Sequence, residues 1–128
     1  MTRQGALRIL LVEDEFLIAF TMERMLHRFG VEVVGPIGSV AEALAIACSA
    51  ELDGAVLDVN IDGEKIYPCA EQLGDRGIPF ILTTGYAAAN LPERYRTAAR
   101  LGKPFSEADL RSALERTFKP RVDTPGAP

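Results

Sequence analysis

Residues 55–65 read AVLDVNIDGEK, and this stretch is compatible with two different folds. Asp58, Asn60, Asp62 and Gly63 match the first half of a calcium-binding loop of the D-x-[DN]-x-[DN]-G type, which lies between two helices. Alternatively, residues 55–57 belong to a buried strand, and Asp58 is a single carboxylate at its carboxyl end. An open α/β sheet places its active site at such strand ends.

The calcium interpretation fails at two points. A calcium loop has a bidentate Glu at its twelfth position, whereas the twelfth residue counted from Asp58 is Cys69. The residues before Asp58 (GAVLD, 54–58) are typical of a strand rather than a helix. Asp62-Gly63 is then expected to form the turn between this strand and the next helix.

Size and composition predict one globular domain. The chain has 128 residues, of which 48% are hydrophobic and 25% charged. A net charge of −4 and a pI near 5.0 argue against nucleic-acid binding. No apolar run is long enough for a membrane span or a signal peptide, so no membrane association is expected. Cys48 and Cys69 lack metal-ligand spacing, which indicates a cytoplasmic protein with reduced thiols.

Strand and helix patterns alternate along the chain. Apolar runs predict strands at 7–12, 31–34, 55–59 and 79–84, and a weaker one within 97–101. Helices are predicted at 16–29, after the N-cap Ser39, at about 64–76 and after the N-cap Ser106, while a fourth helix at 92–100 has a poor pattern. We therefore expect an α/β fold over residues 1–118, a doubly wound five-stranded parallel sheet with helices on both faces. The proline-rich residues 119–128 are expected to be disordered.

Polar residues follow the predicted strands at the edge of the sheet where their carboxyl ends converge. They are Glu13, Asp14, Asp58, Thr83, Thr84 and Lys103. Clustered carboxylates repel one another unless a cation neutralises them, and Mg²⁺ prefers such oxygen ligands. An ammonium and a hydroxyl can hold phosphate oxygens, and a glycine (Gly85) lets the backbone approach closely. The sequence predicts a site for a divalent cation and a phosphoryl group.

The motifs LLVEDE (10–15), LDVN (57–60), Thr84-Gly85 and Lys103-Pro104 occur in the order found in bacterial response-regulator receiver domains. The chain resembles this family from Leu7 to Phe118. The resemblance implies the flavodoxin-like receiver fold, with strand order 2-1-3-4-5.

The resemblance also implies a role for each site residue. Asp58 is the phosphoacceptor, and Lys103 and Thr84 bind the transferred phosphoryl oxygens together with the backbone of Gly85 and Asn60. Asp14, Asp58 and the backbone carbonyl of Asn60 bind Mg²⁺ or Mn²⁺, while Glu13 helps through water. In phosphoryl transfer, catalysis consists mostly of positioning and charge neutralisation, which these groups can supply.

The implied function is that of a single-domain response regulator in a two-component phosphorelay. A histidine kinase or histidine phosphotransferase would donate the phosphoryl group. The chain would then bind an unknown downstream protein or serve as a phosphate sink, in bacterial stress signalling. It is not expected to be an enzyme beyond its own phosphoryl transfer and autodephosphorylation. We expect a monomer, with a phosphorylation-dependent dimer as the alternative.

Two positions depart from the usual receiver pattern. Arg100 stands three residues before the lysine, where most receivers carry an aromatic switch residue. Residues 83–86 (TTGY) partly match the FAT GUY subgroup, with Leu82 and Thr83 in place of its Phe-Ala. Tyr86 and Arg100 are therefore the switch candidates. The alternative for Tyr86 is simple packing of its ring.

Two rival functions fit the sequence less well. An aspartyl-nucleophile phosphatase of the haloacid-dehalogenase type needs a second Asp two residues after the nucleophile, where this chain has Asn60. A phosphorylation-independent binding module would not need Asp58 and Lys103, and both are present.

Four further residues, one histidine and three arginines, are expected to lie outside the site. His27 is expected to be a surface or packing residue. Arg94, Arg96 and Arg100 are expected to form a solvated surface, with a partner-binding surface as the alternative.

Overall fold

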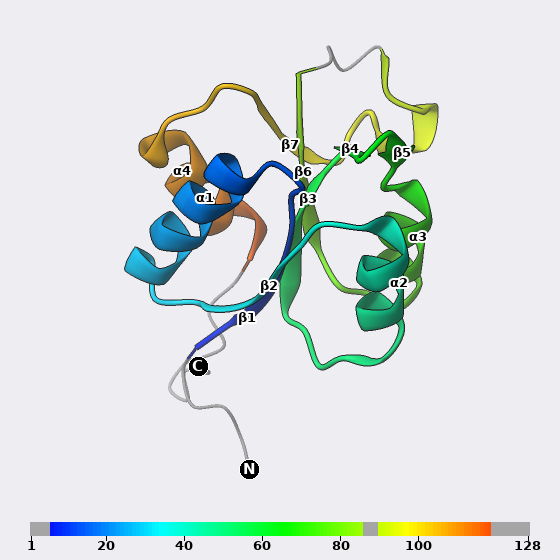
Figure 1. Ribbon diagram of the computed structural model, residues 1–128, viewed down its shortest axis with the longest axis horizontal. Helices are drawn as coiled ribbons and strands as arrows, with labels where there is room; N and C mark the ends of the chain where they lie inside the picture. Colours follow the sequence, from blue (N-terminus) through cyan, green and yellow to red (C-terminus); the bar gives the residue numbers. More distant parts are fainter. Residues whose placement is uncertain (1–5, 86–89, 119–128) are drawn as a thin grey trace, which may run out of the picture.

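The structure is a computed structural model that describes residues 6–85 and 90–118. A parallel sheet of five strands runs through its centre in the order β2-β1-β3-β6-β7, with β2 and β7 at the edges (Figure 1). The strands are β1 (Arg8–Val12), β2 (Glu32–Ile37), β3 (Gly54–Asp58), β6 (Phe80–Thr84) and β7 (Ala99–Gly102). The predicted fold class and strand order are confirmed.

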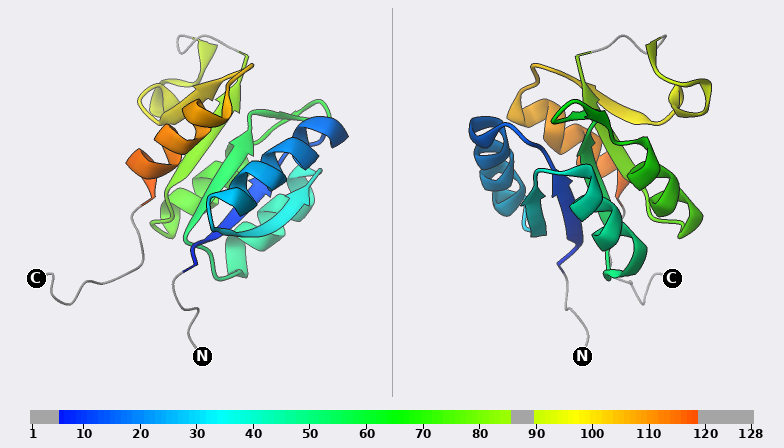
Figure 2. Two further views of the ribbon diagram at one scale, coloured as in Figure 1. Left: turned by 90° about the vertical axis from the view of Figure 1, so that its left-hand side faces the viewer. Right: turned by 45° about the vertical axis from the view of Figure 1, so that its right-hand side comes forward.

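Helices cover both faces of the sheet. On one face lie α1 (Phe16–Arg28) and α4 (Glu107–Thr117), and on the other lie α2 (Val40–Ser49) and α3 (Tyr67–Asp75), as Figures 1 and 2 show. Ser39 caps α2 by accepting a hydrogen bond from the Glu42 N–H. Ser106 and Asp109 form a reciprocal capping box at α4. None of the helices among the described residues is long and apolar enough to cross a membrane.

The hydrophobic core has two layers, one on each side of the sheet. Successive residues of β1 supply both, because side chains alternate along a strand: Ile9 and Leu11 face α1 and α4, while Leu10 and Val12 face α2 and α3. These four side chains are almost completely buried. The continuous apolar run in the sequence thus reflects a strand that is covered on both faces.

The start of the third helix was predicted wrongly. Glu64–Lys65 form strand β5, which pairs with β4 (Asn60–Ile61) in a short antiparallel hairpin, and α3 begins only at Tyr67. Asp62 (φ 51°) and Gly63 (φ 83°) form its two-residue turn, in the left-handed region that a primed hairpin turn requires. The Asp-Gly pair therefore reverses the chain within a hairpin before the helix begins.

The fourth predicted helix is also different in the structure. Within residues 92–100, only Glu93–Tyr95 form a helical turn, the 3₁₀ helix η2, and the chain then enters β7. Tyr95 anchors this turn, since the residue is only 7% exposed and its ring stacks on that of Tyr67 with centroids 5.1 Å apart. One buried aromatic anchors the segment in place of the apolar stripe that a longer helix would need.

Candidate functional site

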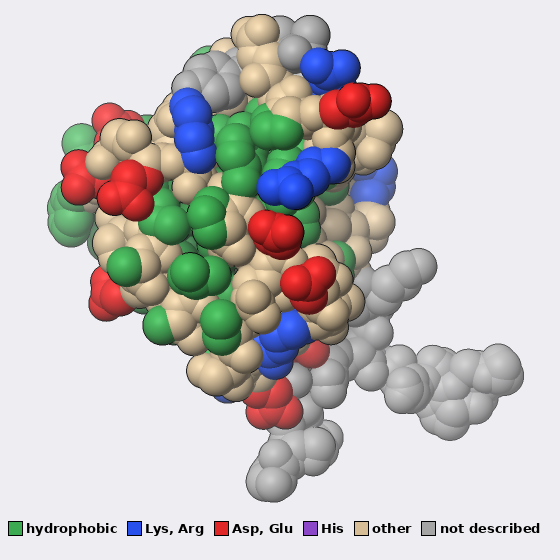
Figure 3. Space-filling model, turned by 90° about the vertical axis from the view of Figure 1, so that its right-hand side faces the viewer, with side chains coloured by type: hydrophobic (Ala, Val, Ile, Leu, Met, Phe, Trp, Pro, Cys, Tyr) green, Lys and Arg blue, Asp and Glu red, His purple; other side chains and the backbone are tan. Residues whose placement is uncertain are grey.

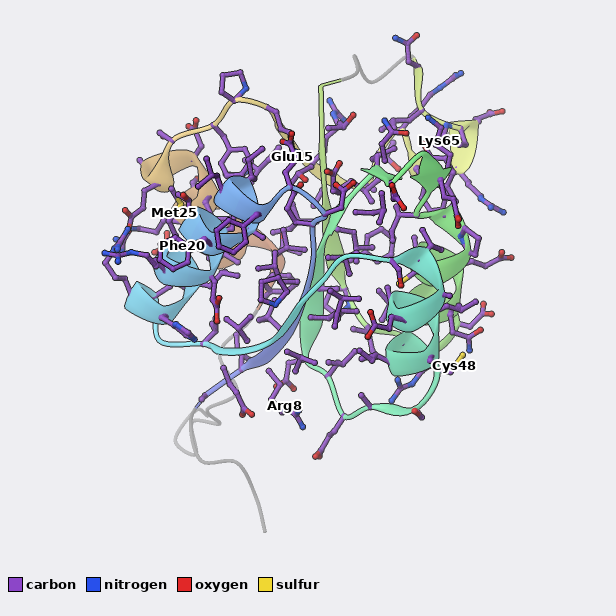
Figure 4. The ribbon with its side chains drawn as sticks, in the orientation of Figure 1. Arg8, Glu15, Phe20, Met25, Cys48 and Lys65 are labelled. Atoms are coloured by element: carbon purple, nitrogen blue, oxygen red, sulfur yellow. The ribbon has the colours of Figure 1, made fainter. Side chains whose placement is uncertain are left out.

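Four strand ends bring the predicted site residues together at one edge of the sheet. Glu13 and Asp14 follow β1, Asp58 is the last residue of β3, and Lys103 follows β7. Glu15, labelled in Figure 4, marks this end of β1. The register of the sheet places Asp58 beside Thr83 and Thr84 beside Gly102.

Three carboxylates form the acidic part of the site. One carboxylate oxygen from each of Glu13, Asp14 and Asp58 lies within 4.8 Å of the others. Glu13 is 3% exposed and Asp58 is 7% exposed, whereas Asp14 is exposed to solvent. The group is therefore open on the Asp14 side, from which a cation or a phosphoryl donor can approach.

The Lys103 ammonium neutralises part of this negative charge. Its Nζ donates to Asp58 Oδ2 at 2.9 Å and to Glu13 Oε1 at 3.1 Å. Burial lowers the pKa of Lys103, but the two carboxylates outweigh this effect, so that the pKa is raised and the ammonium stays charged. Burial is the main reason why the pKa of Glu13 is raised, and the charge of Asp58 adds to it.

Backbone N–H groups orient each carboxylate. Asp58 Oδ1 accepts a hydrogen bond from Asn60 N (3.2 Å), Glu13 Oε2 from Glu15 N (3.1 Å) and Asp14 Oδ2 from Asp62 N (2.7 Å). The last bond ties the turn of the β4–β5 hairpin to the acidic pair. The hairpin thus forms one wall of the site.

A contact between Lys65 and Asn60 was not predicted from the sequence. The two residues face each other across the hairpin, and Lys65 Nζ donates to Asn60 Oδ1 at 2.6 Å. Figure 4 shows Lys65 at the same end of the molecule as Glu15. The Asp62-Gly63 dipeptide could have indicated the hairpin that brings Lys65 and Asn60 together, because this pair between short strand-like segments is typical of a hairpin turn.

Thr84 and Gly85 lie at the end of β6. Thr84 is 2% exposed, and a Cβ added to Gly85 would meet nothing within 4 Å among the described residues. Beside them, Thr83 Oγ1 is buried and has no hydrogen-bond partner among the described residues. Lys103 N donates to the Thr84 carbonyl at 2.9 Å, which places the lysine next to this strand end.

The structure does not test the role of either switch candidate. Tyr86 lies outside the described residues, so its predicted role stays a prediction. Arg100 is exposed on β7, and its Nη1 donates to the Arg96 carbonyl at 3.2 Å.

His27 is exposed near the end of α1, as expected. Tyr95 is a core aromatic that was not predicted from the sequence.

The donor set fits a hard divalent cation. The three clustered carboxylates offer oxygen ligands only, which are the ligands that Mg²⁺ prefers. One ammonium faces three carboxylates, so the site keeps an excess of negative charge that a divalent ion would offset.

Comparison with known proteins gives one family. The family model "Response regulator receiver domain" matches residues 9–115. The chain is 35% identical over 112 residues to the transcriptional regulatory protein PdtaR of Mycobacterium tuberculosis, covering 84% of this chain and 55% of PdtaR. It is 30% identical over 122 residues to the phyllosphere-induced regulator PhyR of Methylorubrum extorquens, covering 88% and 44%. The chain spans about half the length of these curated relatives.

Solved structures show the same fold. SdrG from Sphingomonas melonis Fr1 is 41% identical with a TM-score of 0.75, and the match covers 85% of this chain and 93% of SdrG. The receiver domain of the sensor histidine kinase PA1611 from Pseudomonas aeruginosa PAO1 is 25% identical with a TM-score of 0.71, covering 87% and 96%. That receiver has a magnesium ion coordinated in its active-site cleft.

Proposed function

The chain belongs to the response-regulator receiver family, and we propose on this basis that it accepts a phosphoryl group on Asp58 and signals through the phosphorylated form. The donor is the phosphohistidine of a histidine kinase or histidine phosphotransferase. The observation that carries the proposal is the position of Asp58, a buried carboxylate 2.9 Å from the Lys103 ammonium and beside the acidic pair.

The transfer needs a nucleophile and groups that stabilise the negative charge of the phosphoryl oxygens. A carboxylate oxygen of Asp58 forms a bond to phosphorus while the bond between phosphorus and the donor's imidazole nitrogen breaks, and that nitrogen keeps the electron pair. The Lys103 ammonium and the N–H of Asn60 already contact the two Asp58 oxygens, which fixes the carboxylate for this attack. Lys103, the Thr84 hydroxyl and the backbone of Gly85 and Asn60 then hold the phosphoryl oxygens.

Magnesium is proposed as the cofactor, with manganese as a substitute. Asp14, Asp58 and the carbonyl of Asn60 would bind the ion, and Glu13 would act through water. When bound, the ion supplies positive charge to the phosphoryl oxygens during transfer. The Asp62 N–H keeps the Asp14 carboxylate oriented toward this position through its 2.7 Å hydrogen bond.

We place the body of the donor protein beside Lys103. There, an apolar hollow of about 510 Å³ lies between α1 and residues 103–105, with Leu17, Met22 and Phe105 among its lining residues. The nearby side chains of Phe16 and Leu17 are 77% and 74% exposed, which is unusual for large apolar residues. We assign this surface to the phosphodonor protein. Leu17→Glu should therefore slow transfer from the kinase but leave transfer from a small donor unchanged.

The proposed activity is confined to the chain's own aspartate. Asn60 occupies the position where an aspartyl-nucleophile phosphatase would carry its general acid. The downstream step is binding of a partner protein or withdrawal of phosphate from a relay. Stress signalling is the proposed setting, because residues 84–86 resemble the FAT GUY subgroup.

Intact-protein mass spectrometry tests the central step. Wild type, Asp58→Asn and the control Asp75→Asn are incubated with acetyl phosphate, with MgCl₂ or with EDTA. We expect a phosphate adduct on wild type and on Asp75→Asn only when Mg²⁺ is present, and none on Asp58→Asn. An adduct that persists in Asp58→Asn would show that another residue is the acceptor.

A further inference from the structure

Basic residues are concentrated in one segment of this acidic chain. Residues 94–103 (RYRTAARLGK) contain four of the 14 Lys and Arg residues and no Asp or Glu, although the whole chain carries a net charge of −4. Lys103 belongs to the phosphorylation site. Arg94, Arg96 and Arg100, here named the basic strip, are all exposed and have no part in that site.

The arginines of the basic strip are held in place by neutral groups. The Arg94 guanidinium lies 5.0 Å from the centroid of the buried Tyr95 ring. Arg96 Nε donates to the Leu91 carbonyl and Arg100 Nη1 to the Arg96 carbonyl, each at 3.2 Å. These contacts orient the side chains but leave most guanidinium N–H donors available for a partner.

The charge of the basic strip is poorly compensated. Among the described residues, Glu71 lies within ion-pair distance of Arg94, at 4.0 Å, but both side chains are more than half exposed, so the pair is weak. Glu93 lines the same shallow depression as Arg94. Within the described residues, no carboxylate lies within ion-pair distance of Arg96 or Arg100. Figure 3, which views the α2, α3 and η2 side, shows Lys and Arg side chains next to hydrophobic ones on the upper part of this face, with Asp and Glu side chains close by.

We propose that the basic strip is a docking surface for an acidic segment of a partner protein. A guanidinium binds a carboxylate through two parallel hydrogen bonds, and Arg is enriched in protein interfaces. Pro92, Glu93, Arg94 and Thr97 line a shallow, open depression at the strip. Glu93 disfavours a carboxylate at that point and so restricts where the acidic groups can bind.

A protein segment fits this surface better than a nucleic acid does. Nucleic acids present a continuous row of phosphates, and proteins that bind them without sequence preference use an extended basic surface. Here three arginines lie on a molecule of net negative charge, which repels a long polyanion. A short acidic segment can contact the basic strip without approaching the acidic remainder.

The strip and the phosphorylation site share strand β7. Arg100 lies on β7 opposite Leu82. Lys103 is the first residue after β7 and comes three residues after Arg100. The strip and the site are therefore neighbours along one strand but share no residue. The docking itself does not depend on phosphorylation of Asp58, so the two proposals can fail separately.

Fluorescence anisotropy with a labelled twelve-residue oligo-glutamate peptide tests the inference at low ionic strength. The strip variant R94A/R96A/R100A is compared with R24A/R111A/R116A, which removes the same charge from α1 and α4. We expect the strip variant to bind about tenfold more weakly, since three exposed ion pairs contribute roughly twofold each. The control should stay within twofold of wild type, and Asp58→Asn should bind like wild type.

Misfolding and a different occupant are each tested by a separate measurement. Circular dichroism and adduct formation with acetyl phosphate should be unchanged in the strip variant, and Arg96→Glu serves as a single substitution if the triple variant does not fold. Equal losses in the strip and control variants would overturn the proposal. So would equally tight binding of a twelve-residue oligo-dT, which would indicate a nucleic-acid surface. Dimers of the wild type that the strip variant abolishes in sedimentation would overturn it in favour of a second copy as the occupant.

Discussion

Replacing Gly54 by Ala should destabilise the protein while leaving the phosphorylation chemistry intact. Gly54 begins β3, and a Cβ at this position would lie 2.4 Å from Cε1 and 2.7 Å from Cδ1 of Phe118. Ordinary carbon contacts are about 3.5–4.0 Å, so the ring would have to move by roughly 1 Å or more. Phe118 is 5% exposed and packs in the core layer beneath α4, which leaves it little space to move.

The magnitude follows from this crowding. Inserting a methyl group into a well-packed core costs about 1–3 kcal/mol, and expelling a Phe ring loses a similar amount. We expect Gly54→Ala to lower the free energy of unfolding by about 2 kcal/mol, which corresponds to a decrease in Tm of roughly 6–12 °C for a domain of this size. Asp58 lies four residues further along β3, about 13 Å away, so adduct formation should persist under folding conditions.

Urea denaturation measures this effect. Gly74→Ala in α3 is the matched control, because a Cβ there would meet nothing within 4 Å, and it should stabilise the protein by about 0.5–1 kcal/mol. Phe118→Leu should reduce the cost of Gly54→Ala when the two are combined. A Gly54→Ala protein within about 0.5 kcal/mol of wild type, the usual scatter of surface substitutions, would refute the packing of Phe118 on Gly54.

Four other predictions concern the site and the thiols. Lys103→Met should slow adduct formation with acetyl phosphate by about a hundredfold or more, because the ammonium 2.9 Å from Asp58 is lost, as timed mass spectrometry would show. Asp14→Asn should abolish the Mg²⁺-dependent rise in Tm, which in wild type corresponds to about 2.7 kcal/mol at a Mg²⁺ concentration of 100 Kd. The raised pKa of Glu13, due mainly to burial, means that the folded state binds the proton more tightly than the unfolded state. Without Mg²⁺, its contribution to stability should therefore fall as the pH rises from 4.5 through the folded pKa, and Glu13→Gln should remove this dependence in urea titrations. Burial raises the pKa of Cys69 to about 12, so a thiol reagent at pH 8 should modify the exposed Cys48 in the native protein and both cysteines only after unfolding.

The sequence allowed most of the fold to be predicted, because the central strands β1, β3 and β6 are covered on both faces. Continuous apolar runs such as residues 9–12 have few alternatives to a buried parallel strand, and the caps Ser39 and Ser106 mark their helices clearly. The prediction was wrong where long-range packing decides the local structure. Residues 64–65 join a hairpin, and one buried ring, Tyr95, holds η2 in place of a longer amphipathic helix.

The members of the site were predictable, but their contacts were not. Parallel strands bring their carboxyl ends to one edge, so Asp58 and Lys103 were expected to be close. The Asp62-Gly63 dipeptide is typical of a hairpin, but two-residue strands have no apolar pattern of their own that would have supported this assignment. The bond between Lys65 and Asn60, and that between Asp62 and Asp14, therefore became visible only with the hairpin in place.

The two edges of the sheet have a consequence for the behaviour of the protein at high concentration. An edge strand presents unpaired backbone groups that can recruit a strand of another molecule and start aggregation. The outer strand β2 contains Pro36, which has no N–H to offer, and Gly35 with φ 115° interrupts its regular backbone. At the opposite edge, β7 has only four residues and carries the charged Arg100. Neither edge presents a long, flat, apolar strand to a neighbouring molecule, so both are protected against intermolecular sheet growth.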